Sequence, residues 1–259
     1  MFVSTDDGCR LNVIPGPPAS VPMVLSNSLG TDHSLWDCQV AALSRQRAVW
    51  RYDTRGHGKS GKPQGDYSID RLGKDLVAVI DATGAGRVDL CGVSIGGLTA
   101  LWVALQAPDR VRRVVLANTA AQIGDAGMWA ARIKTVRDDG LGALADATMT
   151  RWFTPEFRAA RPEVVARFHT TIAHTDAAGY AGCCAALRDA DLRALVSQVA
   201  CPTLVVTGRH DPATPPAQGQ WLSEQIAGAR LVELDAAHLA NVERADDFNA
   251  AVLDFTIGE

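Results

Sequence analysis

A serine flanked by glycines is the part of the sequence best suited to covalent chemistry. Ser94 lies in Gly92-Val93-Ser94-Ile95-Gly96, between a short apolar stretch and an amphipathic one that runs to residue 107. This pattern is typical of a sharp turn from a strand to a helix, in which side chains at the glycine positions would clash. In that context Ser94 is a candidate nucleophile, and the amide of Ile95 points toward an oxyanion formed during attack.

The general base is predicted from the positions of the histidines relative to the expected strands. A serine hydroxyl becomes a useful nucleophile when a histidine takes its proton and an acid orients that histidine. His238 follows the expected strand at residues 230–234 and precedes the last expected helix, so it lies on the same rim as Ser94. Three other histidines follow Ser94. His169 and His174 lie in a helical region and are expected at the surface, and His210 is expected to point outward.

The acid that orients His238 is predicted by the same reasoning. Asp211 follows the expected strand at residues 203–207 and therefore reaches the same rim. Asp235 lies only three residues before His238, too close in the chain to face the histidine across the rim. The loop after the expected strand at 111–117 opens with Asn118, which cannot supply a charge. We therefore expect a triad of Ser94, Asp211 and His238.

A second oxyanion donor is expected from the loop after an early strand. This loop reads Asn27-Ser28-Leu29-Gly30, and the amide of Leu29 is the candidate. Because a backbone amide is the donor, the chemistry does not depend on the side chain at that position.

Short β-branched runs alternate with longer helical patterns along most of the chain. The expected strands are residues 21–25, 48–52, 88–91, 111–117, 203–207 and 230–234, and the expected helices are residues 68–82, 95–107, 215–226 and 241–255. Several of the strands are apolar without alternation, which suits strands covered on both faces. The pattern predicts an α/β fold, a mostly parallel sheet with helices on both faces, whose ligands bind at the carboxyl ends of the strands.

Residues 121–197 interrupt this alternation. The stretch has no convincing strand and is expected to form helices at residues 128–138, 143–150, 162–173 and 176–187. A helical insertion between two parallel strands is placed to cover the carboxyl ends of the sheet as a lid. We therefore expect a core of residues 1–120 and 198–259 and a helical cap of residues 121–197.

Composition limits the remaining possibilities. The chain has 259 residues, of which 47% are hydrophobic and 21% charged, with a mean hydropathy of +0.01, values typical of a globular protein rather than a disordered one. Its 25 basic and 29 acidic residues leave a net charge of −4, which argues against nucleic acid as a partner. The longest charge-free run, residues 90–108, contains several glycines and belongs to the expected strand–turn–helix rather than to a membrane span.

The cysteines and the first residues of the chain indicate the compartment. Six cysteines have irregular spacing with no metal-binding pattern, and a chain of this size needs no disulfides, so we expect free thiols, no metal and no cofactor. Asp6 and Asp7 lie where a secretory signal would need basic and then apolar residues. These features favour a cytoplasmic protein. The sequence does not specify an oligomeric state.

With these motifs, the chain resembles the α/β-hydrolase family over essentially its whole length. Besides the serine turn, residues 53–60 read Asp-Thr-Arg-Gly-His-Gly-Lys-Ser, which is similar to the family's Asp-x-Arg-Gly-x-Gly-x-Ser turn. That turn is structural in the family, so the resemblance implies no catalytic role for Asp53 or His57. The chain departs from the family at Asn27-Ser28, where the usual sequence is His-Gly, and this departure concerns the position of the Leu29 donor.

More narrowly, the chain is similar to the 3-oxoadipate enol-lactonases, in residues 25–31, 111–120, 129–133 and 151–155. The resemblance implies hydrolysis of a small-molecule lactone that carries a carboxylate, 3-oxoadipate enol-lactone, by a cofactor-free serine route. It also implies substrate binding by Trp129 and Arg132. In a helix these two share a face with Ile133 and Val136, and a guanidinium can hold a carboxylate with two parallel hydrogen bonds. From spacing alone, the alternative is that Arg132 is a solvated residue of the lid.

Other functions fit the same residues. Another carboxylesterase, or a hydrolase of carbon–carbon bonds in ring-cleavage products, would use the same triad on the same fold. Haloalkane dehalogenases and epoxide hydrolases resemble this fold with a carboxylate where this chain has Ser94. A ligand sensor on a hydrolase fold is the non-enzymatic alternative, and turnover of a chromogenic short-chain ester separates it from an enzyme.

Overall fold

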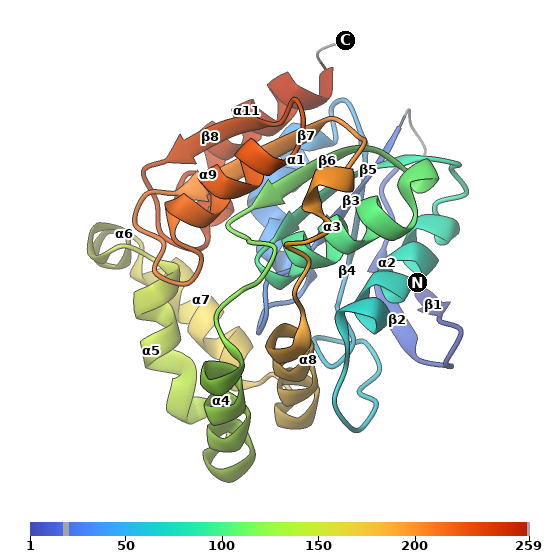
Figure 1. Cartoon of the computed structure of the whole chain (residues 1–259). Coiled ribbons are helices and arrows are strands. Elements are labelled where there is room, and N and C mark those ends of the chain that lie inside the picture. The colour runs from blue at the N-terminus through green and yellow to red at the C-terminus, as the bar shows by residue number, and fades with distance from the viewer. Residues whose placement is uncertain (18–20, 258–259) are drawn as a thin grey trace.

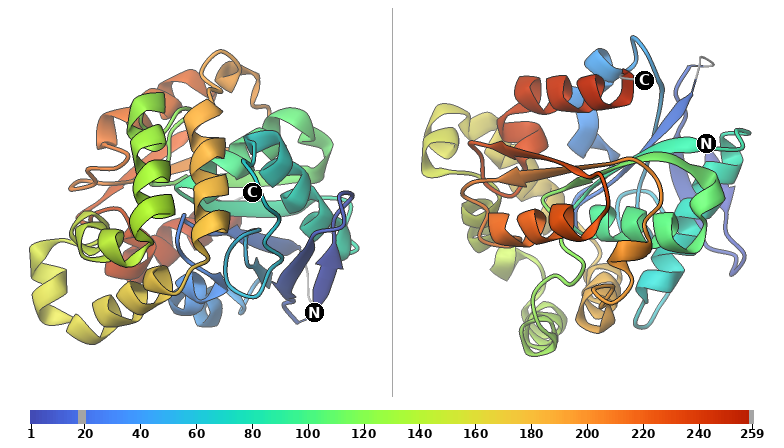
Figure 2. Two further views of the ribbon diagram at one scale, coloured as in Figure 1. Left: turned by 90° about the horizontal axis from the view of Figure 1, so that it is seen from below. Right: turned by 45° about the horizontal axis from the view of Figure 1, so that its top comes forward.

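The chain forms an eight-stranded sheet with helices on both faces and a further group of helices beyond one end of the strands (Figure 1). The computed structural model describes residues 1–17 and 21–257, so residues 18–20 and 258–259 of the expected core lie outside the described residues. Helices α1 and α11 cover one face of the sheet, and α2, α3 and α9 cover the other (Figure 2). The predicted α/β fold is confirmed.

The strands run in the order β1-β2-β4-β3-β5-β6-β7-β8. Their bounds are β1 Phe2–Ser4, β2 Arg10–Ile14, β3 Pro22–Ser26, β4 Ala48–Tyr52, β5 Val88–Val93, β6 Val111–Ala117, β7 Thr203–Gly208 and β8 Arg230–Leu234. The last six pair in parallel, and all six were predicted. The antiparallel pair β1 and β2 at the edge was not predicted, because three and five residues with polar alternation give little periodic signal.

The helices fill the connections between the strands. They are α1 Asp37–Leu43, α2 Ile69–Ala82, α3 Ile95–Gln106, α4 Ala126–Asp139, α5 Gly142–Trp152, α6 Pro155–Ala160, α7 Pro162–Ala173, α8 Ala177–Asp189, α9 Pro216–Gln225, α10 Ala240–Glu243 and α11 Ala245–Ile257, with short 3₁₀ turns η1 His33–Trp36, η2 Pro108–Arg110 and η3 Val196–Gln198. Within the described ranges, no helix is both long and apolar enough to cross a bilayer.

Two expectations about helices were wrong, and two short helices were missed. The stretch after Ser94 was expected to be amphipathic, but α3 is buried on most of its surface because it packs against both β5 and β6. The expected single helix at residues 241–255 is two helices, α10 and α11, because Arg244 leaves the helical region with φ −123° and ψ 54°. Helices α1 and α6, of seven and six residues, are too short for a periodic pattern and were missed.

Helices α4–α8, which we call the cap helices, lie between β6 and β7 in the chain and beyond the carboxyl ends of the parallel strands (Figure 1). Helices α4 and α8 lie side by side (Figure 2). The segment leaves and rejoins the sheet at neighbouring points, since the Leu192 amide donates a 2.9 Å hydrogen bond to the Ala121 carbonyl. The division into a core and a cap at residues 121 and 197 stays a prediction.

Candidate active site

Ser94 lies on the turn between β5 and α3, with backbone angles φ 59° and ψ −124° that side-chain-bearing residues rarely adopt. A Cβ atom at Gly92 would come within 2.2 Å of the Gly96 carbonyl oxygen, and one at Gly96 would come within 2.2 Å of the Ser26 carbonyl oxygen. Hydrogen bonds stabilise the turn. The Ser94 amide donates to the Ala117 carbonyl (3.0 Å), and the Ser94 carbonyl accepts from the Leu98 amide and the Thr119 hydroxyl. The glycines therefore permit a turn in which Ser94 is fixed in a strained conformation.

Asp211 and His238 form a buried pair. The Asp211 Oδ2 atom lies 2.8 Å from His238 Nδ1, and each residue is 3% exposed. The Asp211 carboxylate accepts further hydrogen bonds from the Ala213 amide and from Thr214, through both its amide and its hydroxyl. Asn118 Nδ2 is another donor, at 3.0 Å from Oδ2. The carboxylate is therefore fixed in place on both oxygens.

The surroundings of Asp211 keep it ionised. Burial alone would raise the pKa of its carboxyl, but the positive charge and hydrogen bond of His238, together with the Thr214 donors, hold that pKa below the ordinary value of 3.8. An ionised Asp211 that accepts from Nδ1 leaves Nε2 of His238 as the nitrogen available to a reacting group.

Ser94 and His238 line the same cavity, beneath the cap helices. The cavity has a volume of about 120 Å³, smaller than the pockets that hold drug-sized ligands, and it therefore suits a small substrate. Leu29, Trp129 and Arg132 line it as well. The structure thus brings the predicted groups to one space, and their catalytic and binding roles stay predictions.

The loop after β3 lies against the serine turn. Ser26 pairs with Gly92 across β3 and β5, so the residues that follow Ser26 run beside Ser94. Asn27, which stands where the family usually has histidine, donates to the Tyr52 carbonyl (2.6 Å) and accepts from Trp36 Nε1 (2.8 Å). Its amide side chain therefore anchors the loop to β4 and to Trp36.

Two backbone amides are free to bind an oxyanion. The Leu29 amide donates to no acceptor within the described part of the chain. Ile95 is the first residue of α3, and an amide in the first turn of a helix has no partner one turn earlier. Both residues line the space around Ser94 or adjoin it, so their amides can share one developing negative charge.

His57 is hydrogen-bonded to the loop that follows β3. Its Nε2 atom accepts a 2.9 Å hydrogen bond from the Gly30 amide, next in the chain to Leu29, and its Nδ1 atom lies 3.2 Å from the Arg55 carbonyl. This pattern assigns the ring proton to Nδ1 and requires a neutral ring. Burial lowers the pKa of His57 accordingly. His57 is therefore a structural residue that holds the loop carrying the Leu29 amide.

Among the residues of the cavity wall that sequence reasoning missed are Arg151 of α5 and Tyr180 of α8. Burial raises the pKa of the Tyr180 hydroxyl, so it lines the cavity as a neutral group. Arg151 belongs to residues 151–155, whose similarity to enol-lactonases was a usable signal. Its position at the cavity depends on how α5 packs over the sheet, which spacing does not specify.

The other histidines that follow Ser94 lie elsewhere. His169 is partly exposed and His174 is exposed, each with a partner on the cap helices. His210 is exposed and contacts Asp235, with Nε2 2.9 Å from Oδ1, beside a larger groove of about 660 Å³. That groove contains neither Ser94 nor Asp211, and Asp235 is occupied by surface cations, so the smaller cavity is the candidate site.

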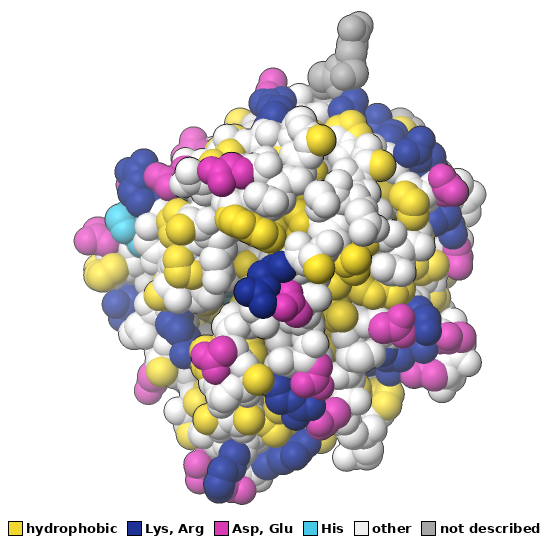
Figure 3. Space-filling model, in the orientation of Figure 1, with side chains coloured by type: hydrophobic (Ala, Val, Ile, Leu, Met, Phe, Trp, Pro, Cys, Tyr) yellow, Lys and Arg dark blue, Asp and Glu magenta, His cyan; other side chains and the backbone are white. Residues whose placement is uncertain are grey.

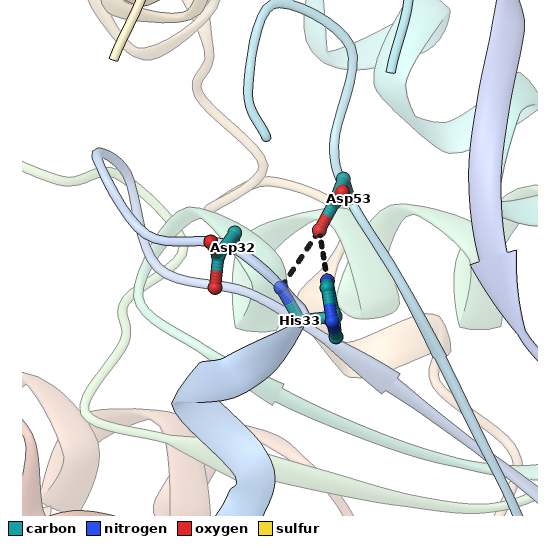
Figure 4. A group of neighbouring side chains, drawn as sticks. All are labelled: Asp32, His33 and Asp53. Carbon is teal, nitrogen blue, oxygen red and sulfur yellow. Dashed lines mark hydrogen bonds and ion pairs between the residues drawn. The ribbon is translucent and has the colours of Figure 1, made fainter. Parts of the chain in front are cut away.

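One cluster in the described part of the chain has metal-ligand atoms close together: Asp32, His33 and Asp53 (Figure 4). Asp53 Oδ1 accepts from both the amide and the ring of His33, each at 2.8 Å. Its Oδ2 accepts from Asn12 Nδ2 and from the Lys59 amide, each at 2.9 Å. Both oxygens are therefore already bound by donors, and this geometry marks a structural junction rather than a metal centre.

Comparison with known proteins adds independent information. Residues 21–245 match the model of the α/β-hydrolase fold family. The chain is 45% identical over 230 residues to 3-oxoadipate enol-lactonase 2 of Acinetobacter baylyi, covering 89% of this chain and 86% of that protein. It is 37% identical over 249 residues to 3-oxoadipate enol-lactonase 1 of the same organism, covering 96% and 93%.

A solved structure gives the same relationship in three dimensions. The crystal structure of the enol-lactonase from Burkholderia xenovorans superimposes with a TM-score of 0.97 at 45% identity. The match covers 99% of this chain and 100% of that one. The similarity therefore extends over the cap helices as well as the sheet.

Proposed function

This chain belongs to the α/β-hydrolase family, and from that premise we propose that it hydrolyses 3-oxoadipate enol-lactone to 3-oxoadipate. It is a carboxylic-ester hydrolase that acts on a small-molecule lactone. The observation that supports this most directly is the cavity in which Ser94, His238 and the guanidinium of Arg132 meet. The ester bond of the lactone would react with Ser94 and His238, and the carboxylate of the same molecule would pair with Arg132.

In the first half of the reaction, Ser94 Oγ attacks the lactone carbonyl carbon while His238 Nε2 takes the hydroxyl proton. Asp211 stabilises the resulting imidazolium through Nδ1. The amides of Leu29 and Ile95 donate to the carbonyl oxygen as it becomes negative. The ring carbon–oxygen bond then breaks, the enol oxygen takes the proton from His238, and the enol becomes the ketone of an acyl-serine.

In the second half, water attacks the acyl-serine. His238 takes a proton from the water, the same two amides hold the oxyanion, and Ser94 recovers its proton as the new carboxylate leaves. The cycle consumes one water and needs no cofactor. Because an enol is a better leaving group than an alkanol, ring opening demands less of the acid than hydrolysis of a simple alkyl ester.

The substrate carboxylate requires a cation in the cavity, because a buried carboxylate without a partner is costly. Arg132 supplies this charge, and its guanidinium lies over the ring of Trp129, 5.7 Å from the centroid. The aromatic plane limits the orientations of the guanidinium. Trp129 also offers a flat apolar surface to the lactone ring.

We place the protein in the cytoplasm as part of the same proposal. All six cysteines are free thiols, five of them buried, which is the state that a reducing compartment maintains.

The experiment is turnover of purified protein on 3-oxoadipate enol-lactone, measured as loss of the lactone absorbance and as appearance of 3-oxoadipate. We expect kcat/KM for the lactone to exceed that for 4-nitrophenyl acetate, a neutral ester. The Ser94→Ala variant should lose on the order of 10⁶-fold in kcat on both compounds. Turnover of the neutral ester without turnover of the lactone would retain the hydrolase and reject the substrate.

A further inference from the structure

Two guanidinium groups, not one, face the cavity that contains Ser94. Arg132 comes from α4 and Arg151 from α5, and both side chains are partly buried in the wall. Among the described residues that line this cavity there is no aspartate or glutamate. The wall therefore carries two positive charges with nothing of opposite sign beside them.

Two other arginines of the cap helices, Arg137 and Arg188, have acidic partners. On the face shown in Figure 3, basic and acidic side chains lie next to one another in small groups. Arg137, on the same helix as Arg132, contacts Asp66 at 3.0 Å, and Arg188 contacts the same aspartate at 3.2 Å. Within residues 1–17 and 21–257, neither Arg132 nor Arg151 forms an ion pair. The two cavity arginines thus differ from Arg137 and Arg188, whose charges are matched by Asp66.

Arg151 is held in position by its own helix. Its Nη2 atom donates a 3.2 Å hydrogen bond to Thr148 Oγ1, and that hydroxyl in turn donates to the Leu144 carbonyl at 2.7 Å. Thr148 also lines the cavity. This contact uses one of the five N–H groups of the guanidinium and leaves the others for a ligand.

Two guanidinium groups in one cavity wall are electrostatically unfavourable together. Burial, and then the charge of Arg132, lower the pKa of Arg151. A guanidinium stays protonated in spite of such a shift, so the wall keeps both charges and favours an anion as its ligand.

We infer that Arg151 and Arg132 together form a two-guanidinium site for the carboxylate of the substrate. This rests on the proposed lactone hydrolysis and adds to it a second specificity-determining residue. One guanidinium binds both carboxylate oxygens, and the other donates to a remaining lone pair. The site spans α4 and α5, so a bound carboxylate joins two cap helices over the ester that Ser94 attacks.

The site makes the enzyme selective for anions in a way that one exposed arginine cannot. A neutral molecule of the same shape leaves both guanidinium groups unmatched, whereas a carboxylate satisfies both. Lysine in place of Arg151 would keep the charge but lose the planar set of donors.

The test measures binding of adipate, which has the carbon skeleton of the product, against its neutral analogue adipamide. Trp129 and Trp152 line the cavity, so tryptophan fluorescence reports occupancy without any turnover. We expect Arg151→Met to raise the Kd for adipate about tenfold or more, Arg151→Lys to give an intermediate value, and both to leave adipamide binding unchanged. Arg137→Met is the matched control on α4 and should bind adipate like the unaltered protein.

The outcomes separate this inference from the proposed function. Failure to hydrolyse the enol-lactone, with adipate binding that depends on Arg151, rejects the substrate and keeps the two-guanidinium site. Hydrolysis of the enol-lactone with Kd and KM unchanged in Arg151→Met overturns the site and keeps the substrate. Equal weakening of adipate and adipamide, in both Arg151→Met and Arg151→Lys, also overturns it, because Arg151 would then only shape the cavity.

Discussion

The side chain of Asn118 donates a 3.0 Å hydrogen bond to Asp211, on the same Oδ2 atom that faces His238. Asn118 follows β6 and Asp211 follows β7, so two neighbouring parallel strands place the donor and the acceptor at one point. Asn118 has φ 44°, a left-handed conformation that asparagine and aspartate tolerate better than most residues. Asn118 cannot itself serve as the acid of the triad, but its side chain positions Asp211, which is the predicted acid.

Changing Asn118 to aspartate should alter the pH dependence of hydrolysis. A second carboxylate beside the Asp211–His238 pair adds negative charge, which favours the protonated, inactive form of the general base. We expect the acid limb of kcat/KM to move to higher pH by about one unit. The measurement is the pH–rate profile on a neutral ester. Asn118→Ala, which removes the donor without adding charge, should lower kcat by about five- to tenfold with a smaller change in that limb.

The choice between Asp211 and Asp235 as the acid can be decided by paired isosteric variants. Asp211→Asn should lower kcat by roughly 10⁴-fold, because the amide cannot stabilise the imidazolium or select its tautomer. Asp235 is exposed and contacts His210, Arg209 and Arg244, so Asp235→Asn should leave kcat within about twofold. A larger loss for Asp235→Asn than for Asp211→Asn would reject the assigned triad.

The conformation of Ser94 should limit the stability of the fold. Its φ and ψ lie where glycine is favoured, and such strain costs about 1–3 kcal/mol. Ser94→Gly should therefore raise the free energy of unfolding by about 1 kcal/mol, after the greater flexibility of glycine in the unfolded chain is subtracted. Denaturant titration measures the change. Ser94→Ala keeps the strain and is the control, expected within about 0.5 kcal/mol of the unaltered protein.

His57 should make stability depend on pH near neutrality. Because burial lowers its pKa in the folded protein, the unfolded chain binds a proton more readily below the ordinary value of 6.5. Neutral His57 therefore makes its full contribution to the free energy of unfolding above about pH 6.5, and this contribution is lost as the pH falls below that value. We expect the free energy of unfolding to decrease between pH 7 and pH 5.

The variant His57→Gln isolates this effect, since its side chain can still accept from the Gly30 amide and does not titrate. Its stability should change less over the same interval. Carboxylates such as Asp211 lose their stabilising charge only at lower pH, where both proteins should respond alike. Identical slopes for the two proteins between pH 7 and pH 5 would assign the dependence to another group.

The central strands and the serine turn could be predicted because their signals are local. Apolar β-branched runs mark strands such as β6 and β7, and the glycines around Ser94 specify a turn by sterics alone. The order of the sheet then brings Asp211 and His238 to one rim, so chain order and strand ends were enough to pair them.

Other features depend on contacts between distant segments and could not be predicted. The bond from Gly30 to His57 joins residues 27 positions apart, and nothing in either local sequence specifies it. The approach of Arg151 to the cavity depends on how α5 packs over the sheet. The break at Arg244 was hidden because α10 and α11 together keep an approximate apolar stripe.

The hydrogen bond between Leu192 and Ala121 has a consequence for how substrate choice can change in evolution. The two ends of the cap segment lie next to each other. A short loop would therefore be enough to connect β6 to β7, and insertions of different length at this point add little to the entropic cost of closing the loop. The cap segment contains Arg132 and Arg151. It does not contain Ser94, Asp211 or His238, which follow strands of the sheet. A single continuous exchange of sequence could therefore replace the anion-selective wall while the ester-cleaving groups keep their places.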